Sequence, residues 1–151
     1  MMTKIKKILF PHDLSENASK MIPYVLLVAK AYSSKIYLLH VVDDLPRWGK
    51  AYIPHTSMDV FQKEAVKAGE EAVDKLRKEQ LRDHPDVETK VVSGDPGSEI
   101  LSVIESEDVD LVIMGTHGRK GLEQILFGSV AENVVKRAPV PVMTVNPHKL
   151  E

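Results

Sequence analysis

The sequence predicts a single α/β domain in which a parallel sheet is covered by helices on both faces. Short apolar runs alternate with longer amphipathic segments along the chain, which is the pattern of repeated strand–helix–strand units. The run 35–42 is apolar almost throughout, as is typical of a strand buried on both faces. A chain of 151 residues without cysteine is long enough to form its own core without disulfides, and we expect one domain over residues 1–151.

The first half of the chain is predicted to contain two strands and two helices. The strands are residues 7–10 and 35–42. Between them, apolar residues recur at helical spacing after Ser15, a plausible N-cap. Pro23 lies inside this pattern, and we expect it to distort the helix because proline removes a main-chain hydrogen bond. A long charged helix with one apolar face is predicted over residues 58–83.

An irregular loop is predicted between the second strand and the long helix, over residues 43–57. It contains prolines, a glycine and the aromatic side chains of Trp48 and Tyr52, without a regular period. Aromatic residues in such a loop are consistent with a mobile lid or a partner surface, and equally with a small satellite core.

The second half continues the alternation of strands and helices. The expected elements are strands over 87–92, 109–115 and 140–145 and a helix over 129–138. Asp95 and Pro96 open a further helix as N-cap and first helical residue. Ligands of open parallel sheets bind beyond the carboxyl ends of the strands, so candidate site residues are expected directly after the strands.

The composition excludes several classes of protein. With 20 basic and 22 acidic residues the formal net charge is −2, which gives no basic surplus for a nucleic-acid partner. No stretch approaches the ~20 apolar residues of a membrane span, and the first apolar run is too short for a signal peptide. We expect a cytoplasmic protein that binds neither nucleic acid nor membrane.

A glycine-rich loop is the most informative motif of the chain. Four of the eight glycines lie in Met114–Val130. Glycine serves where the backbone needs a positive φ or where another group approaches the main chain closely. Gly115, Gly118 and Gly128-Ser129 follow the pattern G-x2-G-x9-G-S, which is neither a Walker A loop nor the dinucleotide fingerprint. The pattern leads into a helix N-terminus, which favours an anion.

Two polar residues of this loop have alternative explanations. Ser129 is placed either to cap the helix or to bond a phosphate oxygen. Arg119 is able to pair with phosphate oxygens. A glycine-rich connection between a strand and a helix is also compatible with a simple turn that holds no ligand.

The sequence resembles the ATP-binding subgroup of the universal stress protein family over essentially the whole chain. The matching stretches are "ILFPHDLSENA", "LLHVVD", "SGDPGSEIL", "DLVIMGTHGRKGLEQILFGSVAENVV" and "PVPVMTV". In that family the G-x2-G-x9-G-S motif marks members that bind ATP. The resemblance, carried by these stretches, implies a five-stranded parallel sheet in the order 3-2-1-4-5, Rossmann-like and similar to the adenine nucleotide alpha hydrolases.

The resemblance also implies a role for each site residue. Pro11 and Val41 line the adenine pocket, Val41 through its backbone, and Asp13 lies beside the ribose or the adenine. Met114 and Gly115 face the ribose and the first phosphate. The phosphates are held by Gly118, Gly128, Ser129 and Val130, with Arg119 as a further loop position. Mg²⁺ or Mn²⁺ would be bound through these phosphates.

The sequence assigns no catalytic residue. Candidate acids or bases are His12, His40 and His117, but such histidines are more often loop or strand-end residues with ordinary hydrogen bonds. Asp13, Asp43 and Asp44 follow strands, where carboxylates usually cap or face solvent, so no metal-ligating residue is assigned. No nucleophile–base pair and no residue that orients a water is evident.

The function expected from these observations is an ATP-binding regulator or molecular switch in the stress response, with a downstream protein partner. A slow ATPase or nucleotide-dependent transferase is the alternative in the enzyme class, and a nucleotide-free structural dimer is a third. A homodimer is expected through residues 140–145, an apolar edge strand that a second copy would cover.

Overall fold

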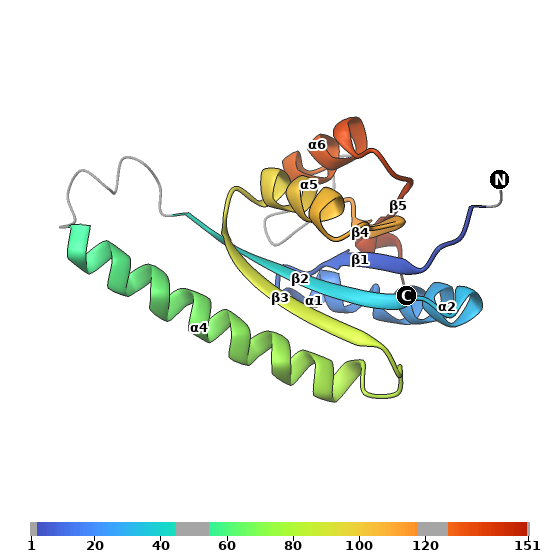
Figure 1. The fold of residues 1–151 in the computed structure, drawn as a ribbon, viewed down its shortest axis with the longest axis horizontal. Helices are drawn as coiled ribbons and strands as arrows, with labels where there is room; N and C mark the ends of the chain where they lie inside the picture. The colour runs from blue at the N-terminus through green and yellow to red at the C-terminus, as the bar shows by residue number, and fades with distance from the viewer. Residues whose placement is uncertain (1–2, 45–54, 118–126, 151) are drawn as a thin grey trace.

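The five strands form one parallel sheet in the order β3-β2-β1-β4-β5, with helices above and below it (Figure 1). In this computed structural model, the structure describes residues 3–44, 55–117 and 127–150. The strands are β1 (Lys7–Pro11), β2 (Lys35–Asp43), β3 (Val87–Gly94), β4 (Leu111–Gly115) and β5 (Val142–Val145). The expected fold class and strand order are confirmed.

The helices cover both faces of the sheet. One face carries α2 (Ile22–Tyr32) and α4 (His55–Gln80), and the other carries α5 (Pro96–Ser106) and α6 (Ser129–Arg137) (Figure 1). A short helix, α1 (Glu16–Ser19), precedes α2, and the 3₁₀ turn η1 (Pro147–Lys149) follows β5. None of the helices within the described ranges is long and apolar enough to cross a membrane.

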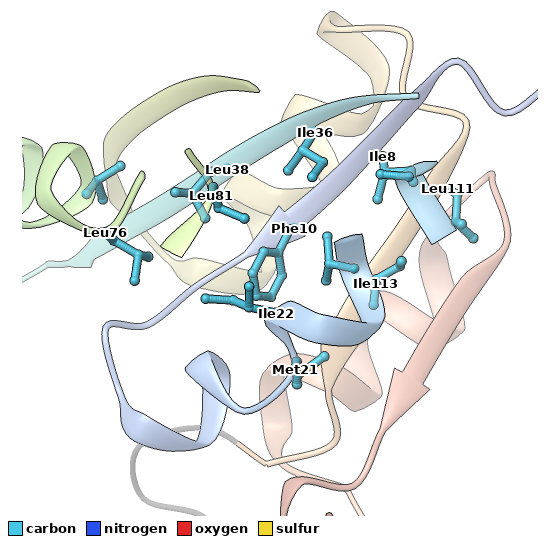
Figure 2. Close-up of a cluster of buried hydrophobic side chains, with 13 residues drawn as sticks. Ile8, Phe10, Met21, Ile22, Ile36, Leu38, Leu76, Leu81, Leu111 and Ile113 are labelled. Carbon is cyan, nitrogen blue, oxygen red and sulfur yellow. The ribbon is translucent and has the colours of Figure 1, made fainter. Parts of the chain in front are cut away.

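The sheet separates two hydrophobic cores. Along β1, Ile8 and Phe10 pack against residues of α2 and α4, whereas Leu9 packs against residues of α5 and α6. Figure 2 shows the first of these cores, with Phe10 near its centre. Successive strand residues point to opposite faces, and here both faces are covered. The apolar runs of the strands are therefore continuous rather than alternating.

The helix predicted after Ser15 is two helices. Ser15 caps α1 as expected, because its Oγ accepts from the N–H of Ala18 at 3.2 Å. The chain then turns at Lys20–Met21, and Pro23 falls in the first turn of α2. Proline is tolerated there because its missing N–H would have no helical partner. The expected distortion is real, but it is a break that precedes the proline.

The boundaries of the long helix also differ from the prediction. α4 begins at His55 and ends at Gln80, so the connection after β2 is shorter than the predicted loop. Residues 45–54, which include Trp48 and Tyr52, lie outside the described residues, and the lid hypothesis for them stays a prediction. Asp95 caps α5 as predicted, with its Oδ2 accepting from the N–H of Ser98 at 3.0 Å.

Candidate functional site

A pocket of about 820 Å³ opens at the carboxyl edge of the sheet. It lies where β1 and β4 are neighbours and the strand order reverses, the position at which open parallel sheets bind ligands. The volume is within the range of sites for cofactor-sized molecules.

Eight of the ten predicted site residues line this one pocket. They are Pro11, Asp13, Val41, Met114, Gly115, Gly128, Ser129 and Val130. The other two, Gly118 and Arg119, lie outside the described residues. The structure thus brings together the ends of β1, β2 and β4 and the start of α6, while the role of each residue stays a prediction.

One part of the pocket wall is apolar. It contains Pro11 at the end of β1, Val41 of β2 and Met114 of β4, together with Ile100 from α5 and Val130 from α6. These side chains belong to the second core or pack against it, apart from Pro11. Such a wall suits a flat apolar group such as a nucleobase.

The start of α6 borders the same pocket and is bare, in the sense that it has no side-chain cap. Gly128 is the N-cap, with φ −71° and ψ 165°, and has no side chain that could cap the helix. The first helical hydrogen bond runs from the N–H of Glu132 to the carbonyl of Gly128, 3.0 Å. Helix geometry leaves the N–H groups of the first turn without helical partners. Of the two roles predicted for Ser129, capping is wrong, because Gly128 occupies that position.

The two described glycines of the loop are explained differently. A Cβ added to Gly115 would lie 3.1 Å from the carbonyl oxygen of His117 and 3.2 Å from the Sδ of Met21, so tight packing favours glycine there. A Cβ added to Gly128 would meet the carbonyl oxygen of Thr116 at 3.4 Å, an ordinary contact. Neither glycine has the positive φ that such loops can demand. Among the described residues, nothing requires glycine at 128.

The connection between β1 and α1 is held by its own side chains. The Oδ1 of Asp13 accepts from the N–H of Ser15 at 3.0 Å and also from its hydroxyl. Leu14 has a left-handed backbone, with φ 66°. This turn brings Asp13 to the pocket wall.

His12, also in this connection, is a buried neutral base. Its ring is 3% exposed, and its Nδ1 accepts from the N–H of Leu14 at 2.9 Å. Burial lowers the pKa of His12 to about 4, an effect that nearby Asp13 opposes and His40 reinforces. The Nδ1 of His40 donates to the carbonyl of His12 at 2.8 Å. Both histidines therefore have structural hydrogen bonds, although both line the pocket.

His117, the third candidate acid or base, is buried beside the loop. Its Nδ1 lies 2.8 Å from the Oγ1 of Thr116, and its ring packs edge-on against His148 with 5.0 Å between centroids. Within the described part of the chain, no group of three or more His, Cys, Asp or Glu side chains is arranged to hold a metal. The arrangement supports binding, and it identifies no acid, base or nucleophile.

Several pocket residues were not predicted. Asp95 and Pro96 line the pocket and directly follow β3, so the rule that points to strand ends could have found them. Ala18 and Met21 also line it. They come from the α1 region, where the spacing of apolar residues predicts only a core face.

The chain is similar to known proteins over almost its whole length. The model of the universal stress protein family matches residues 4–146. The universal stress protein MJ0531 of Methanocaldococcus jannaschii is 35% identical over 147 residues, which are 97% of this chain and 85% of that protein. The solved structure of MJ0577 from the same organism has a TM-score of 0.83 at 34% identity and covers 95% of this chain and 97% of its own.

A more distant structure shares the fold. A universal stress protein from Archaeoglobus fulgidus, solved in complex with dAMP, has a TM-score of 0.59 at 20% identity. It covers 96% of this chain and 100% of its own.

Proposed function

The chain belongs to the universal stress protein family, and on that premise we propose that it binds an adenine nucleotide, ATP foremost, in the pocket described above. The nucleotide acts as the signal of a cytoplasmic molecular switch in the stress response, read by a downstream protein partner. In this proposal residues 1–151 form a single nucleotide-binding domain. The site consists of the eight pocket residues predicted from the sequence, with Gly118 and Arg119.

The observation that carries this proposal is the start of α6. A glycine N-cap gives the first-turn N–H groups beside the pocket no side-chain cap, and the helix dipole adds positive potential at the same point. Phosphate groups bind at such helix starts. A ligand that approaches the backbone would explain glycine at 128, because the atoms of the described residues leave ordinary van der Waals space for a Cβ.

The rest of the pocket fits the other parts of a nucleotide. The apolar wall around Val41 and Ile100 suits the base, and Asp13 is placed to accept a hydrogen bond from a ribose hydroxyl. The dAMP bound by the Archaeoglobus protein of the same fold supports an adenine nucleotide as the class of ligand. A divalent cation, Mg²⁺ or Mn²⁺, would reach the site with the phosphates.

Two measurements test the proposal. Mass spectrometry of small molecules released from the purified protein is expected to show an adenine nucleotide. Isothermal titration of nucleotide-free protein with ATP and GTP, each with Mg²⁺, is expected to show tighter binding of ATP. Absence of binding by both methods, or equal affinity for GTP, would contradict it. Measurement of phosphate release in the same samples separates a switch from the slow ATPase.

We also propose a homodimer formed through β5. Among the described strands, β5 is at the edge of the sheet and pairs only with β4, and Met143 on it is 40% exposed. Antiparallel pairing with a second copy would satisfy both edges, and a two-fold contact closes on itself.

Light scattering tests the dimer. The unmodified protein is expected to have the mass of a dimer at micromolar concentration. Replacing Val142 and Thr144 by lysine is expected to shift the mass toward a monomer, because like charges then meet near the two-fold axis. A monomeric mass for the unmodified protein, or an unchanged dimer in the double variant, would exclude this interface.

A further inference from the structure

We propose that His12 is a positioning residue of the nucleotide site: its ring fixes the turn at Leu14 and thereby holds the Asp13 carboxylate at the pocket wall. The inference rests on the proposed function, since it assigns a role in nucleotide binding. It concerns a residue that the sequence offered only as a possible acid or base.

The first step of the argument is the turn itself. Asp13 is followed by Leu14, whose φ of 66° is unfavourable for any residue other than glycine, asparagine or aspartate. A branched apolar side chain holds this conformation only where its surroundings enforce it. The Nδ1 of His12 accepts from the N–H of Leu14 at 2.9 Å, which compensates for part of that cost.

The second step is how firmly the ring of His12 is held. Because Nδ1 accepts a hydrogen bond, the ring proton is on Nε2, which donates to the Oγ of Ser19 at 3.1 Å. The ring also packs edge-on against Phe10, with 5.4 Å between ring centroids. One side chain therefore joins the end of β1, the turn and α1.

The backbone of His12 is fixed as well. Its N–H donates to the carbonyl of Leu39 at 2.8 Å, and its carbonyl accepts from the Nδ1 of His40 at 2.8 Å. Asp13 therefore lies between a fixed residue and a fixed turn. A carboxylate held in this way loses less conformational freedom when a ligand binds.

The third step is that His12 is neutral under ordinary conditions. Burial lowers the pKa of His12 to about 4, so Nδ1 keeps the lone pair that accepts from Leu14 at neutral pH. A charged ring would have a donor at that position and would repel the N–H.

The experiment combines ATP titration calorimetry with five variants. His12→Phe keeps the ring that packs on Phe10 and removes both nitrogens. His12→Asn keeps an acceptor for the N–H of Leu14, because an asparagine oxygen bonds the backbone two residues on. Asp13→Ala and the double variant with His12→Phe test whether His12 acts through Asp13. His84→Phe is the matched control, because His84 bonds the carbonyl of Ser34 at 2.8 Å and does not line the pocket.

The expected results are specific to positioning. His12→Phe weakens ATP binding by about tenfold, the equivalent of one lost charge-assisted contact. His12→Asn recovers most of that loss. Adding His12→Phe to Asp13→Ala weakens binding no further, since residues that act as one unit are not additive. His84→Phe lowers the melting temperature and leaves the affinity unchanged.

Each contrary result is informative. If the unmodified protein binds no adenine nucleotide, the proposed function fails and the inference fails with it. If it binds ATP and His12→Phe binds equally well, only the inference is overturned. It is also overturned if the losses from His12→Phe and Asp13→Ala simply add. If His12→Phe does not fold, His12→Asn provides the test. The inference is supported if this variant binds ATP with near-normal affinity and its Leu14 amide, observed by ¹⁵N NMR, is still protected from exchange. Lost affinity with that amide still protected refutes it.

Discussion

Two strand-to-helix junctions border the pocket, and they are built in opposite ways. After β1, the side chains of His12, Asp13 and Ser15 bond the backbone of the turn and cap α1. At the start of α6, Gly128 offers no side chain and no cap. The first junction bonds its own polar groups, whereas at the second Gly128 gives the first-turn N–H groups no side-chain cap.

This difference separates the junction that stabilises the fold from the junction that does not. Changes at the self-bonded junction remove contacts that the folded protein makes with itself, so they are expected to lower its stability. Changes at the bare junction remove no side-chain cap, so they are expected to affect ligand binding without lowering the stability of the fold. Four predictions test this separation.

The largest effect is expected at the bare junction. Gly128→Val should abolish ATP binding, because a branched side chain occupies the space into which phosphate must come. The fold should survive, since φ −71° and ψ 165° are open to valine and the first added carbon has ordinary contacts. Calorimetry and thermal melting of both proteins measure the two quantities, and unchanged affinity would show that nothing approaches Gly128.

At the self-bonded junction, acid is expected to destabilise the protein through His12. The pKa of this ring is about 4 in the folded protein and 6.5 in the unfolded chain. The unfolded state therefore binds the additional proton first, and the free energy of unfolding falls as the pH drops from 6.5 to 4. The loss amounts to about 3 kcal/mol at its limit. Urea unfolding at several pH values measures it, and His12→Phe should show a smaller slope in this interval.

A pair of matched substitutions compares the two helix starts directly. Ser15→Ala should lower the free energy of unfolding by about 1 kcal/mol, because it removes the cap of α1. Ser129→Ala should leave stability unchanged, because Ser129 is not a cap, and should weaken ATP binding. Denaturant unfolding and calorimetry on both variants provide the comparison. An equal loss of stability in the two would remove the distinction between the junctions.

The smallest expected change in stability comes from Gly128→Asp, which should stabilise the fold and abolish ATP binding. Gly128→Asp supplies the missing cap and a favourable charge at the helix N-terminus, so the free energy of unfolding should rise by about 0.5 kcal/mol. The same carboxylate occupies and repels the phosphate position, so ATP binding should be lost. Differential scanning calorimetry without and with ATP detects both changes. If the variant is stabilised and still binds ATP, the phosphates do not bind at Gly128.

Much of the fold is predictable because the strands are short apolar runs buried on both faces. The expected ranges 7–10 and 35–42 differ by one residue at one end from β1 and β2. The helix boundaries were less accurate. Pro23 was interpreted as a defect in one helix, although proline in a first turn is equally the sign of a new helix. The start of α4 at His55 was predicted too late, because the prolines and the glycine in the preceding sequence favour an irregular loop.

The candidate site was predictable where the chain passes the carboxyl edge of the sheet. Pro11, Val41 and Gly128 were found because each lies at the end of a strand or at the start of a helix. The role of His12 was not predictable, because its partners Ser19 and His40 meet it only through tertiary structure. Ser129 was considered as a possible N-cap of α6, one residue after the actual N-cap Gly128, since both glycine and serine are common at that position.

The central position of β1 has a consequence for how the chain folds during synthesis. Its register joins Ile8 to Leu111 of β4, and the carboxylate of Asp110 accepts from the N–H groups of Lys6 and Lys7 at 2.9 and 3.0 Å. Strands β1, β2 and β3 are able to associate while the rest of the chain is still on the ribosome. The edge of β1 stays unpaired until β4 has been made, and contacts so distant in sequence form slowly. The pocket therefore forms last, and under the proposed function a nascent chain would bind nucleotide only after its final third has been made.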